Sequence, residues 1–322
     1  MVKELIEDSV YMKILVTGGA GFIGSHLVDR LLERSNRVVC VDNFILGRRE
    51  HLKDAMENPN FSLHELDLLE LDKLDELFNQ ENFDAVFHLA ANSDIRAGTE
   101  STERDLKLTF MTSYHVLECM QRYDVKKILF ASTGAIFGDR EESLKEESVA
   151  LPESLYGASK LASEAFIYAF SGLYDIQAWI CRFPNVVGDR STHGIIFDLL
   201  EKLDRDPANL EVLGNGKQSK PYMYVHELIQ ALLYIFENAD EKINIFNIGP
   251  SDQTSVAEIA QLVLEGCGAK QGIMYTGGTQ GWKGDVPRYE YDTQKLQKLG
   301  WGPPTTSFEA VRLAVRKIIE TR

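Results

Sequence analysis

Cysteine is scarce in this sequence. Only four occur among 322 residues, at Cys40, Cys119, Cys181 and Cys267, and no two of them form a CxxC pair. Structural zinc sites and disulfide frameworks both need clustered or regularly spaced cysteines. We therefore expect neither a metal site nor disulfides, and we predict a reducing, cytoplasmic location.

Long apolar runs and a basic leader are also lacking. No apolar run approaches the ~18 residues that a membrane-spanning helix needs. Residues 1–10 are acidic and polar, unlike the basic stretch and apolar core of a secretory signal. The sequence therefore predicts no membrane partner.

Positive charge is in short supply as well. Lys and Arg number 34 against 49 Asp and Glu, which gives a net charge of −15 at pH 7. Because contacts with nucleic-acid phosphates need clustered Lys and Arg, nucleic acid is not an expected partner. Hydrophobic residues make up 44% and charged residues 26% of the chain, which is typical of a folded globular protein.

The first half of the chain alternates between two kinds of segment. Six apolar runs rich in β-branched residues are predicted strands, at 12–17, 37–41, 61–65, 84–89, 127–132 and 176–182. Helical periodicity lies between most of them, at 24–34, 69–79, 105–122 and 154–173. This alternation predicts an α/β fold, a Rossmann-type doubly wound parallel sheet with helices on both faces.

The pattern changes near residue 180. Gly, Pro and Asn become frequent, and shorter helices are predicted at 195–203, 226–238, 255–267 and 307–321. This part looks too irregular to fold alone. We predict an N-terminal extension (1–11), a Rossmann domain (12–180) and a smaller α/β substrate-binding domain (181–322) that sits on the Rossmann domain and returns segments to it.

A glycine-rich turn follows the first predicted strand. Gly18, Gly21 and Gly24 have GxxGxxG spacing, with a strand before them and a helix after. Such a turn lets the backbone approach a diphosphate, and the helix N-terminus offers N–H groups to the anion. Asp42 ends the next strand, where a carboxylate can accept both adenosine ribose hydroxyls and would repel a 2′-phosphate. These features predict a site for NAD rather than NADP.

A tyrosine and a lysine form the second candidate site. Tyr156 and Lys160 are four residues apart at the start of a predicted helix, so they share a face. The ammonium, together with an oxidised nicotinamide, is expected to lower the pKa of the phenol from about 10 toward neutrality. Tyr156 is then a candidate general base for hydride transfer. Thr133, at the carboxyl edge of the sheet, can hydrogen-bond a sugar hydroxyl or carbonyl.

These residues belong to a series of ordered motifs. The motifs are TGGAGFIGSHL (17–27), VDNF (41–44), DL (67–68), HLAA (88–91), ASTGAIFG (131–138), YGASK (156–160), RFPNVVG (182–188), KPYMYVHE (220–227), FNIG (246–249) and GDVP (284–287). From residue 12 onward the chain thereby resembles the extended short-chain dehydrogenase/reductase family, in its nucleotide-sugar epimerase and dehydratase branch. The resemblance implies an NAD-dependent enzyme whose substrate is a nucleotide-diphosphate sugar, with a UDP-sugar as the first choice.

The resemblance also implies roles for single residues. Tyr156 is the catalytic base, Lys160 binds the nicotinamide ribose, and Thr133 completes the catalytic set. Asn185 contacts the nucleotide diphosphate. Lys220 stands where many relatives carry Arg, and it keeps the charge but loses the bidentate fork.

The remaining residues implied by the resemblance lie around the cofactor and the sugar. The expected cofactor contacts are Gly18, Gly21, Phe22, Ile23, Gly24, Asp42, Asn43, Asp67, Leu68, Leu89, Ala90, Ala91, Tyr156 and Lys160. Arg288 or Lys283 is expected to replace a diphosphate-binding Arg that relatives often carry near Trp282. Thr192, His193 and residues 275–285 are candidates for selecting the sugar.

The absence of acidic residues after Thr133 narrows the range of possible reactions. Gly134 and Ala135 follow Thr133, where dehydratases and decarboxylases of the family carry acidic residues. Dehydration and decarboxylation are therefore disfavoured, which leaves a 4-epimerase of the UDP-glucose/UDP-galactose type that works through a transient 4-keto sugar. The alternatives are a net oxidoreductase (a 4-keto reductase or a sugar dehydrogenase), an epimerase or dehydratase for another NDP-sugar, and a non-catalytic NAD-binding protein.

Two predicted helices suggest that copies of the chain associate with one another. The helices at 105–122 and 154–173 carry more apolar residues than one buried face requires, namely Phe110, Met111, Met120, Phe166, Tyr168 and Phe170. Relatives pair this helix duo across a twofold axis, so the resemblance implies a homodimer. Simple burial of both helices between the sheet and loops explains the pattern equally well.

Overall fold

A seven-stranded parallel sheet forms the centre of the computed structural model, which describes residues 11–98, 100–140, 142–206, 208–270, 272–279, 281 and 289–322. The strands are β1 (Lys13–Thr17), β2 (Arg37–Asp42), β3 (Phe61–Glu65), β4 (Ala85–His88), β5 (Lys127–Thr133), β7 (Gln177–Phe183) and β12 (Ile243–Asn247). Their order is β12-β7-β5-β4-β1-β2-β3, and every neighbouring pair is parallel. The predicted Rossmann-type sheet is confirmed, and the six predicted strands agree to within one residue at each end.

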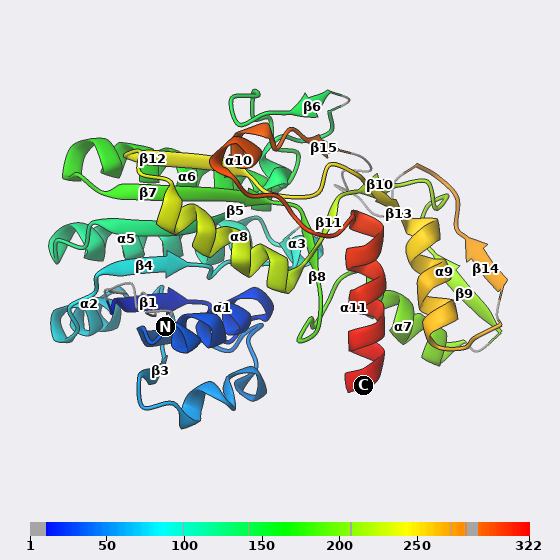
Figure 1. The fold of residues 1–322 in the computed structure, drawn as a ribbon, viewed down its shortest axis with the longest axis horizontal. Coiled ribbons are helices and arrows are strands. Elements are labelled where there is room, and N and C mark those ends of the chain that lie inside the picture. The colour runs from blue at the N-terminus through cyan, green and yellow to red at the C-terminus, as the bar shows by residue number, and fades with distance from the viewer. Residues whose placement is uncertain are drawn as a thin grey trace, which may run out of the picture.

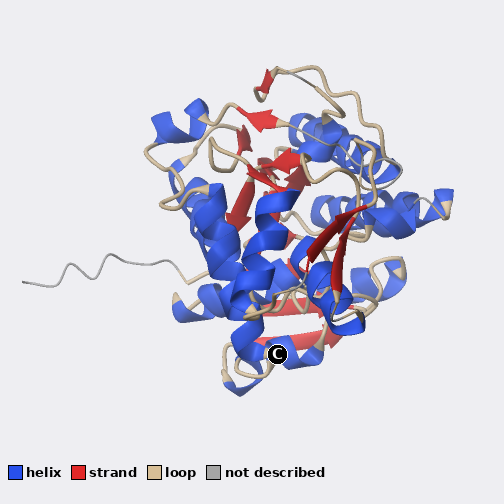
Figure 2. Cartoon of the chain, turned by 90° about the vertical axis from the view of Figure 1, so that its right-hand side faces the viewer, coloured by secondary structure: helices blue, strands red, loops and turns tan. Residues whose placement is uncertain are grey.

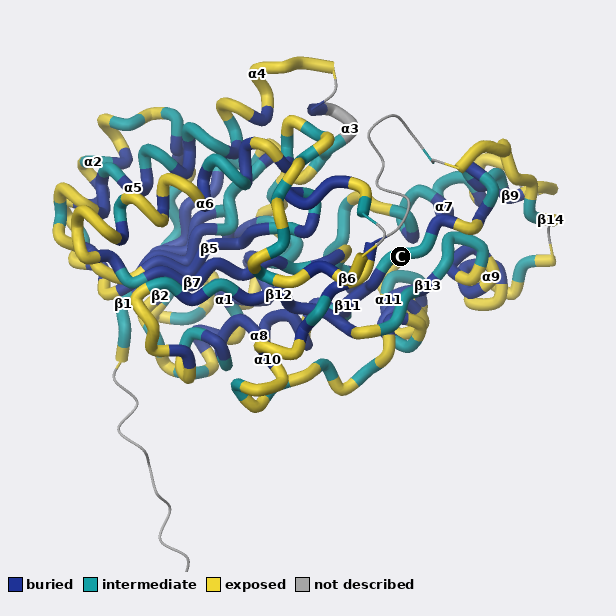
Figure 3. The backbone as a smooth tube through the Cα atoms, turned by 90° about the horizontal axis from the view of Figure 1, so that it is seen from above, coloured by how far each residue is buried: buried dark blue, intermediate teal, exposed yellow. Residues whose placement is uncertain are grey.

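Helices cover both faces of this sheet (Figures 1 and 2). One face carries α1 (Phe22–Glu33), α8 (Val225–Asn238) and α10 (Gln294–Leu299), and the other carries α2 (Leu71–Gln80), α5 (Thr112–Arg122) and α6 (Leu155–Tyr174). Successive residues of β1 alternate between the two cores, since Ile14 and Val16 pack with α1 and α8 whereas Leu15 packs with α2 and α5. The inner strands are accordingly buried (Figure 3). None of the described helices combines the length and apolar character that a bilayer crossing requires.

The chain beyond β7 builds a further layer at one end of the sheet (Figure 1). Its helices are α7 (Ile195–Arg205), α9 (Val256–Gly266) and α11 (Ser307–Thr321), which share a core of their own. The short strand pairs are β8 (Asn185–Val187) with β11 (Tyr222–Tyr224), β9 (Asn209–Val212) with β14 (Gly272–Tyr275), β10 (Ser219–Lys220) with β13 (Thr254–Ser255), and β6 (Ser143–Leu144) with β15 (Glu290–Tyr291). The same stretch of chain also supplies β12, α8 and α10 to the central sheet and its helices.

The helix predicted at 105–122 is interrupted, which corrects the prediction of one regular helix. A π-helical stretch, η3 (Leu106–Met111), precedes α5. The Thr112 hydroxyl donates to the carbonyls of Leu108 and Thr109, and the Ser113 hydroxyl donates to Thr109 as well. Hydroxyl groups that occupy helix carbonyls in this way compete with the regular ladder, and π-helical turns are often found at functional sites.

Short helical segments complete the described part of the chain. They are α3 (Ile95–Gly98), α4 (Thr102–Asp105) and the 3₁₀ turns η1 (Arg49–Leu52), η2 (Ala55–Glu57) and η4 (Gly134–Ile136). Residues 1–10 of the predicted N-terminal extension lie outside the described residues.

Candidate active site

One cavity of about 770 Å³ gathers the predicted site residues at the carboxyl ends of the sheet strands. It is lined by Gly18, Gly21, Phe22, Ile23, Gly24, Asp42, Asn43, Asp67, Leu68, Leu89, Ala90, Ala91, Thr133, Tyr156, Lys160, Asn185 and Lys220. The strand order reverses between β1 and β4, where open α/β sheets bind their ligands. Arg288, with Trp282 and Lys283, lies outside the described residues.

The glycine turn has the close backbone packing that only glycine allows. Gly18 has a φ of +71°, and a Cβ there would lie 2.8 Å from the backbone nitrogen of Ala90. A Cβ on Gly24 would lie 2.1 Å from the carbonyl oxygen of Gly18. Gly21 is the N-cap of α1, and because it has no side chain, the first N–H groups of the helix remain available to an anion. The turn therefore fits the diphosphate of a dinucleotide.

We expect Gly24→Ala to weaken NAD binding by about tenfold or more, because the new methyl group collides with the Gly18 carbonyl and displaces the turn. Calorimetric titration with NAD measures this change. Gly172→Ala is the matched control, since it lies in α6 and a Cβ there has no heavy atom within 4 Å. An unchanged NAD affinity in Gly24→Ala would contradict the assignment of the turn.

Asp42 is held rigidly at the edge of the cavity. One carboxylate oxygen accepts from the Ala20 N–H at 2.9 Å, and the other accepts from the Phe44 N–H at 2.8 Å. Burial raises the pKa of Asp42, whereas these backbone hydrogen bonds lower it. Nearby, the Asn43 amide donates to Asp67 at 3.3 Å and links the ends of β2 and β3. A fixed carboxylate with free lone pairs fits the hydroxyls of the adenosine ribose.

Tyr156 and Lys160 lie in the first turns of α6, which begins after Ser154. The Ser154 side chain caps the helix by accepting a hydrogen bond from a backbone N–H. Lys160 is only 2% exposed, and its Nζ donates to the Ala131 carbonyl at 2.6 Å and lies 6.0 Å from the centre of the Tyr156 ring. Burial lowers the pKa of Lys160 to about 7, and Glu164 opposes this shift.

The pKa of Tyr156 corrects a sequence-based prediction. Burial raises this pKa above its ordinary value, and the Asp105 carboxylate raises it further, while the hydrogen bond with the Thr133 side chain lowers it. The protein groups alone therefore disfavour the phenolate, contrary to the expectation that Lys160 would lower the pKa. The positive charge of a bound nicotinamide acts in the opposite direction.

Asp105 belongs to a polar network that the sequence did not indicate. This carboxylate is 1% exposed and accepts a hydrogen bond from the Asn92 amide at 2.8 Å. The backbone N–H of Asn92 donates to the Thr109 hydroxyl at 3.1 Å, which ties the segment after β4 to η3. The sequence held one indication of this network, because Asn92 directly follows the HLAA motif at the end of a predicted strand.

We expect Asp105→Asn to shift the rising limb of the pH–rate profile toward lower pH. The substitution removes the negative charge that raises the pKa of Tyr156, so the general base ionises at lower pH. Asparagine keeps an oxygen that can accept from Asn92. The profile of kcat against pH measures the shift, and a profile that moves to higher pH would contradict the role of this charge.

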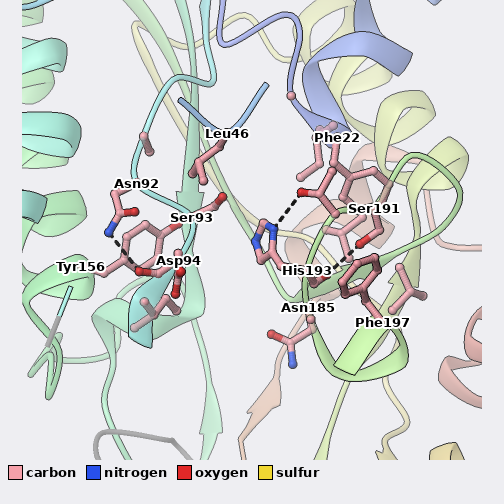
Figure 4. Close-up of a pocket in the computed structure, with 18 of the residues that line it drawn as sticks. Phe22, Leu46, Asn92, Ser93, Asp94, Tyr156, Asn185, Ser191, His193 and Phe197 are labelled. Atoms are coloured by element: carbon pink, nitrogen blue, oxygen red, sulfur yellow. Dashed lines mark hydrogen bonds between the residues drawn. The ribbon is translucent and has the colours of Figure 1, made fainter. Parts of the chain in front are cut away.

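The opposite wall of the cavity comes from the later part of the chain (Figure 4). Tyr156 lies on one side, Asn185 and Phe197 lie on the other, and the His193 ring stands between them. His193 is oriented locally, since its Nδ1 lies 3.2 Å from the Thr192 hydroxyl. Two cations of α7 that the sequence did not single out, Lys202 and Arg205, also line this wall.

A buried ion pair joins α6 to β7 beside the candidate site. Arg182 of β7 donates from Nε and Nη2 to the two carboxylate oxygens of Glu164 in α6, at 3.0 and 2.6 Å. The Ser132 hydroxyl donates to the same carboxylate, and Arg182 also donates to the Glu146 carbonyl at 2.7 Å. Glu164 is one turn beyond Lys160, so the pair fixes α6 against the sheet at the site.

Comparison with known proteins places this chain in one enzyme family. The model of the NAD dependent epimerase/dehydratase family matches residues 14–249. A Methanocaldococcus jannaschii protein that carries the provisional name UDP-glucose 4-epimerase is 32% identical over 308 residues, which cover 94% of this chain and 97% of that protein.

Two crystal structures are similar along nearly the whole chain. One is UDP-glucose 4-epimerase from Thermotoga maritima, solved with UDP-glucose, which is 32% identical in sequence and superposes with a TM-score of 0.87. The match covers 96% of this chain and 99% of the epimerase chain. The other is UDP-glucuronic acid 4-epimerase from Bacillus cereus, solved with UDP-glucuronic acid and NAD, which is 25% identical in sequence and superposes with a TM-score of 0.87. The match covers 97% of this chain and 100% of that chain. Because the two were solved with different UDP-sugars, similarity alone leaves the sugar open.

Proposed function

Since the chain belongs to the NAD-dependent epimerase/dehydratase family, we propose that it is a UDP-sugar 4-epimerase of the UDP-glucose/UDP-galactose type. The observation that carries the proposal is the packing after Thr133. A Cβ on Gly134 would lie 2.0 Å from the Tyr291 hydroxyl oxygen, so the acidic side chain that the family's dehydratases carry there has no room. The site keeps the groups that epimerisation needs and lacks those for elimination.

The proposed reaction begins at the hydroxyl on carbon 4 of the sugar. The Tyr156 phenolate takes the hydroxyl proton, and the Thr133 hydroxyl holds the same oxygen. Bound NAD would supply the hydride acceptor, and then the hydride donor, for carbon 4. Lys160 holds the nicotinamide ribose, and the positive charge of the bound nicotinamide favours the phenolate. In the return step Tyr156 gives its proton back to the sugar oxygen, so the enzyme ends the cycle unchanged.

We propose that residues 12–180 hold NAD and that the nucleotide sugar is held mainly by residues 181–322. Asn185 and Lys220 line the same cavity as Tyr156, and they suit a diphosphate through an amide and an ammonium. This cavity of about 770 Å³ is lined by both sets of residues, so the cofactor and the sugar can meet in it. Lys202 and Arg205 of this wall are already paired with Glu211 and Glu201.

A substrate panel tests the activity. Purified protein is incubated with UDP-glucose, UDP-galactose and the corresponding N-acetyl and uronate pairs, and products are separated by anion-exchange chromatography. We expect the glucose/galactose pair to interconvert fastest, with no net formation of NADH. Stoichiometric NADH turnover would support an oxidoreductase instead, fastest conversion of another pair would replace the proposed sugar, and NAD binding without any conversion would support a non-catalytic protein.

We also propose that two copies pair through α6 and η3. Tyr168 and Leu173 of α6 are 63% and 73% exposed, and Leu106 of η3 is 49% exposed. Phe166 is 39% exposed and packs edge-on against Phe110, with ring centres 5.0 Å apart. Exposed apolar side chains on neighbouring helices suit a helix-to-helix interface. Light scattering measures the mass in solution, and a monomer would refute the dimer.

A further inference from the structure

Two histidines and an aspartate meet on the side of α1, outside the set of residues that line the cavity. His26 lies in α1, Asp189 follows β8, and His226 lies in the first turn of α8. The Nε2 atoms of His26 and His226 lie 3.9 and 3.7 Å from the two carboxylate oxygens of Asp189. One ligand atom from each residue can be chosen so that all three lie within 4.8 Å of one another.

Existing contacts already join the cluster. The Nε2–H of His26 donates to the Asp189 backbone carbonyl at 3.2 Å, a hydrogen bond that an ion on this nitrogen would replace. Each carboxylate oxygen of Asp189 faces one of the two imidazole rings. Arg190, which follows Asp189, is paired with Asp29 at 2.8 Å, which offsets its charge. Because metal ligands must be deprotonated, binding would release protons from the histidines.

The cluster is open to solvent on the side of His226. The side chain of His26 is 4% exposed and that of Asp189 is 26% exposed, whereas that of His226 is 53% exposed. An ion can therefore enter beside His226, and water can fill the remaining coordination position. Two histidines and one carboxylate with a water ligand are a common set for zinc in proteins.

We propose that His26, Asp189 and His226 form a binding site for a divalent transition-metal ion such as Zn²⁺, completed by water. Tetrahedral coordination with bonds of about 2.0–2.1 Å places ligand atoms roughly 3.4 Å apart. One ligand atom from each residue lies within 4.8 Å of the other two, so side-chain shifts of about 1 Å would bring them to this spacing. The site stands apart from Tyr156, and its ion takes no part in hydride transfer.

Such an ion would clamp three segments that are distant in the sequence. Asp189 immediately precedes the loop that supplies Ser191 and His193 to the cavity wall. His26 lies two residues after Gly24, and His226 begins a helix packed on α1. Bound metal would therefore hold the phosphate turn and the sugar-side wall in one arrangement and stabilise the fold against heat.

The test uses the full chain without a polyhistidine tag and Co²⁺ as a spectroscopic probe. We expect one equivalent of Co²⁺ to give the weak d–d absorption of nitrogen and oxygen ligation, and Zn²⁺ to displace it and raise the Tm. His226→Ala should weaken binding by at least about tenfold, because loss of even an outer-shell partner commonly costs that much. His226 is largely exposed, so the variant should keep the Tm of the metal-free wild type.

His64→Ala is the matched control, because it removes a histidine from β3 outside the cluster and should leave Co²⁺ binding unchanged. Three outcomes overturn the proposal. They are no Co²⁺ binding to the wild type, equal binding in His226→Ala, and a strong thiolate charge-transfer band, which would move the ion to the exposed Cys267.

Discussion

Tyr156→Phe is expected to lower kcat by about two to four orders of magnitude, the usual contribution of a positioned general base. Phenylalanine keeps the ring beside Lys160 and removes the oxygen that takes the proton from the sugar in the proposed reaction. Because the ring and the glycine turn remain, the affinity for NAD should stay close to that of the wild type. Conversion of UDP-galactose to UDP-glucose measures kcat, and titration with NAD measures binding.

The pH profile separates this role from a structural one. A general base works when it is deprotonated, so the wild-type rate should rise with pH through the pKa of Tyr156. Burial and Asp105 place that pKa above the ordinary value, and a bound nicotinamide lowers it. Tyr156→Phe has no such group, so its residual rate should lose the rising limb.

Tyr168→Phe is the control for this substitution. It makes the same change in the same helix, at a side chain that lies outside the cavity and that the proposed dimer interface would cover, and loss of its hydroxyl should leave kcat unchanged. If Tyr156→Phe kept the wild-type rate and pH profile, another group would have to accept the proton, and Tyr156 would be a packing residue.

The sheet was predictable from the sequence except for one strand. Strands buried on both faces read as continuous apolar runs, and all six such runs are strands. In β12, Ile243–Asn247, two asparagines interrupt the apolar residues, so the segment does not read as a buried strand. Asn244 is buried because its amide donates to the Ala178 and Glu241 carbonyls, and Asn247 donates to Leu144. These partners exist only in the folded chain.

Residue positions at the candidate site were more predictable than their electrostatics. Gly18, Asp42 and Thr133 follow or end strands, and the topology of a parallel sheet brings such positions together. The pKa of Tyr156 depends instead on burial and on Asp105, which reaches the site through the fold of η3 and the segment after β4. The cluster of His26, Asp189 and His226 was likewise not predictable, because its three residues come from segments that are far apart in the sequence and meet only in the fold.

The second large effect is expected from Glu164→Gln, which should lower the free energy of unfolding by about 3–5 kcal/mol. Arg182 and Glu164 are 6% and 5% exposed, so the substitution leaves a buried guanidinium without its counter-charge. Chemical denaturation measures the loss. Glu103→Gln is the control, because Glu103 pairs with Lys107 on an exposed helix face and its removal should leave stability unchanged within error.

Replacing both partners shows whether the loss of stability comes from an unpaired buried charge or from lost packing. A double variant with Glu164→Leu and Arg182→Met removes both charges and fills the space with apolar groups of similar size. We expect it to be more stable than Glu164→Gln, because no unpaired ion remains inside. If the double variant were equally unstable, its own loss of the bonds to Ser132 and to the Glu146 carbonyl would offset what it gains by removing the unpaired charge. If Glu164→Gln were as stable as the wild type, Arg182 would have found another partner, and the ion pair would not be what fixes α6 to the sheet.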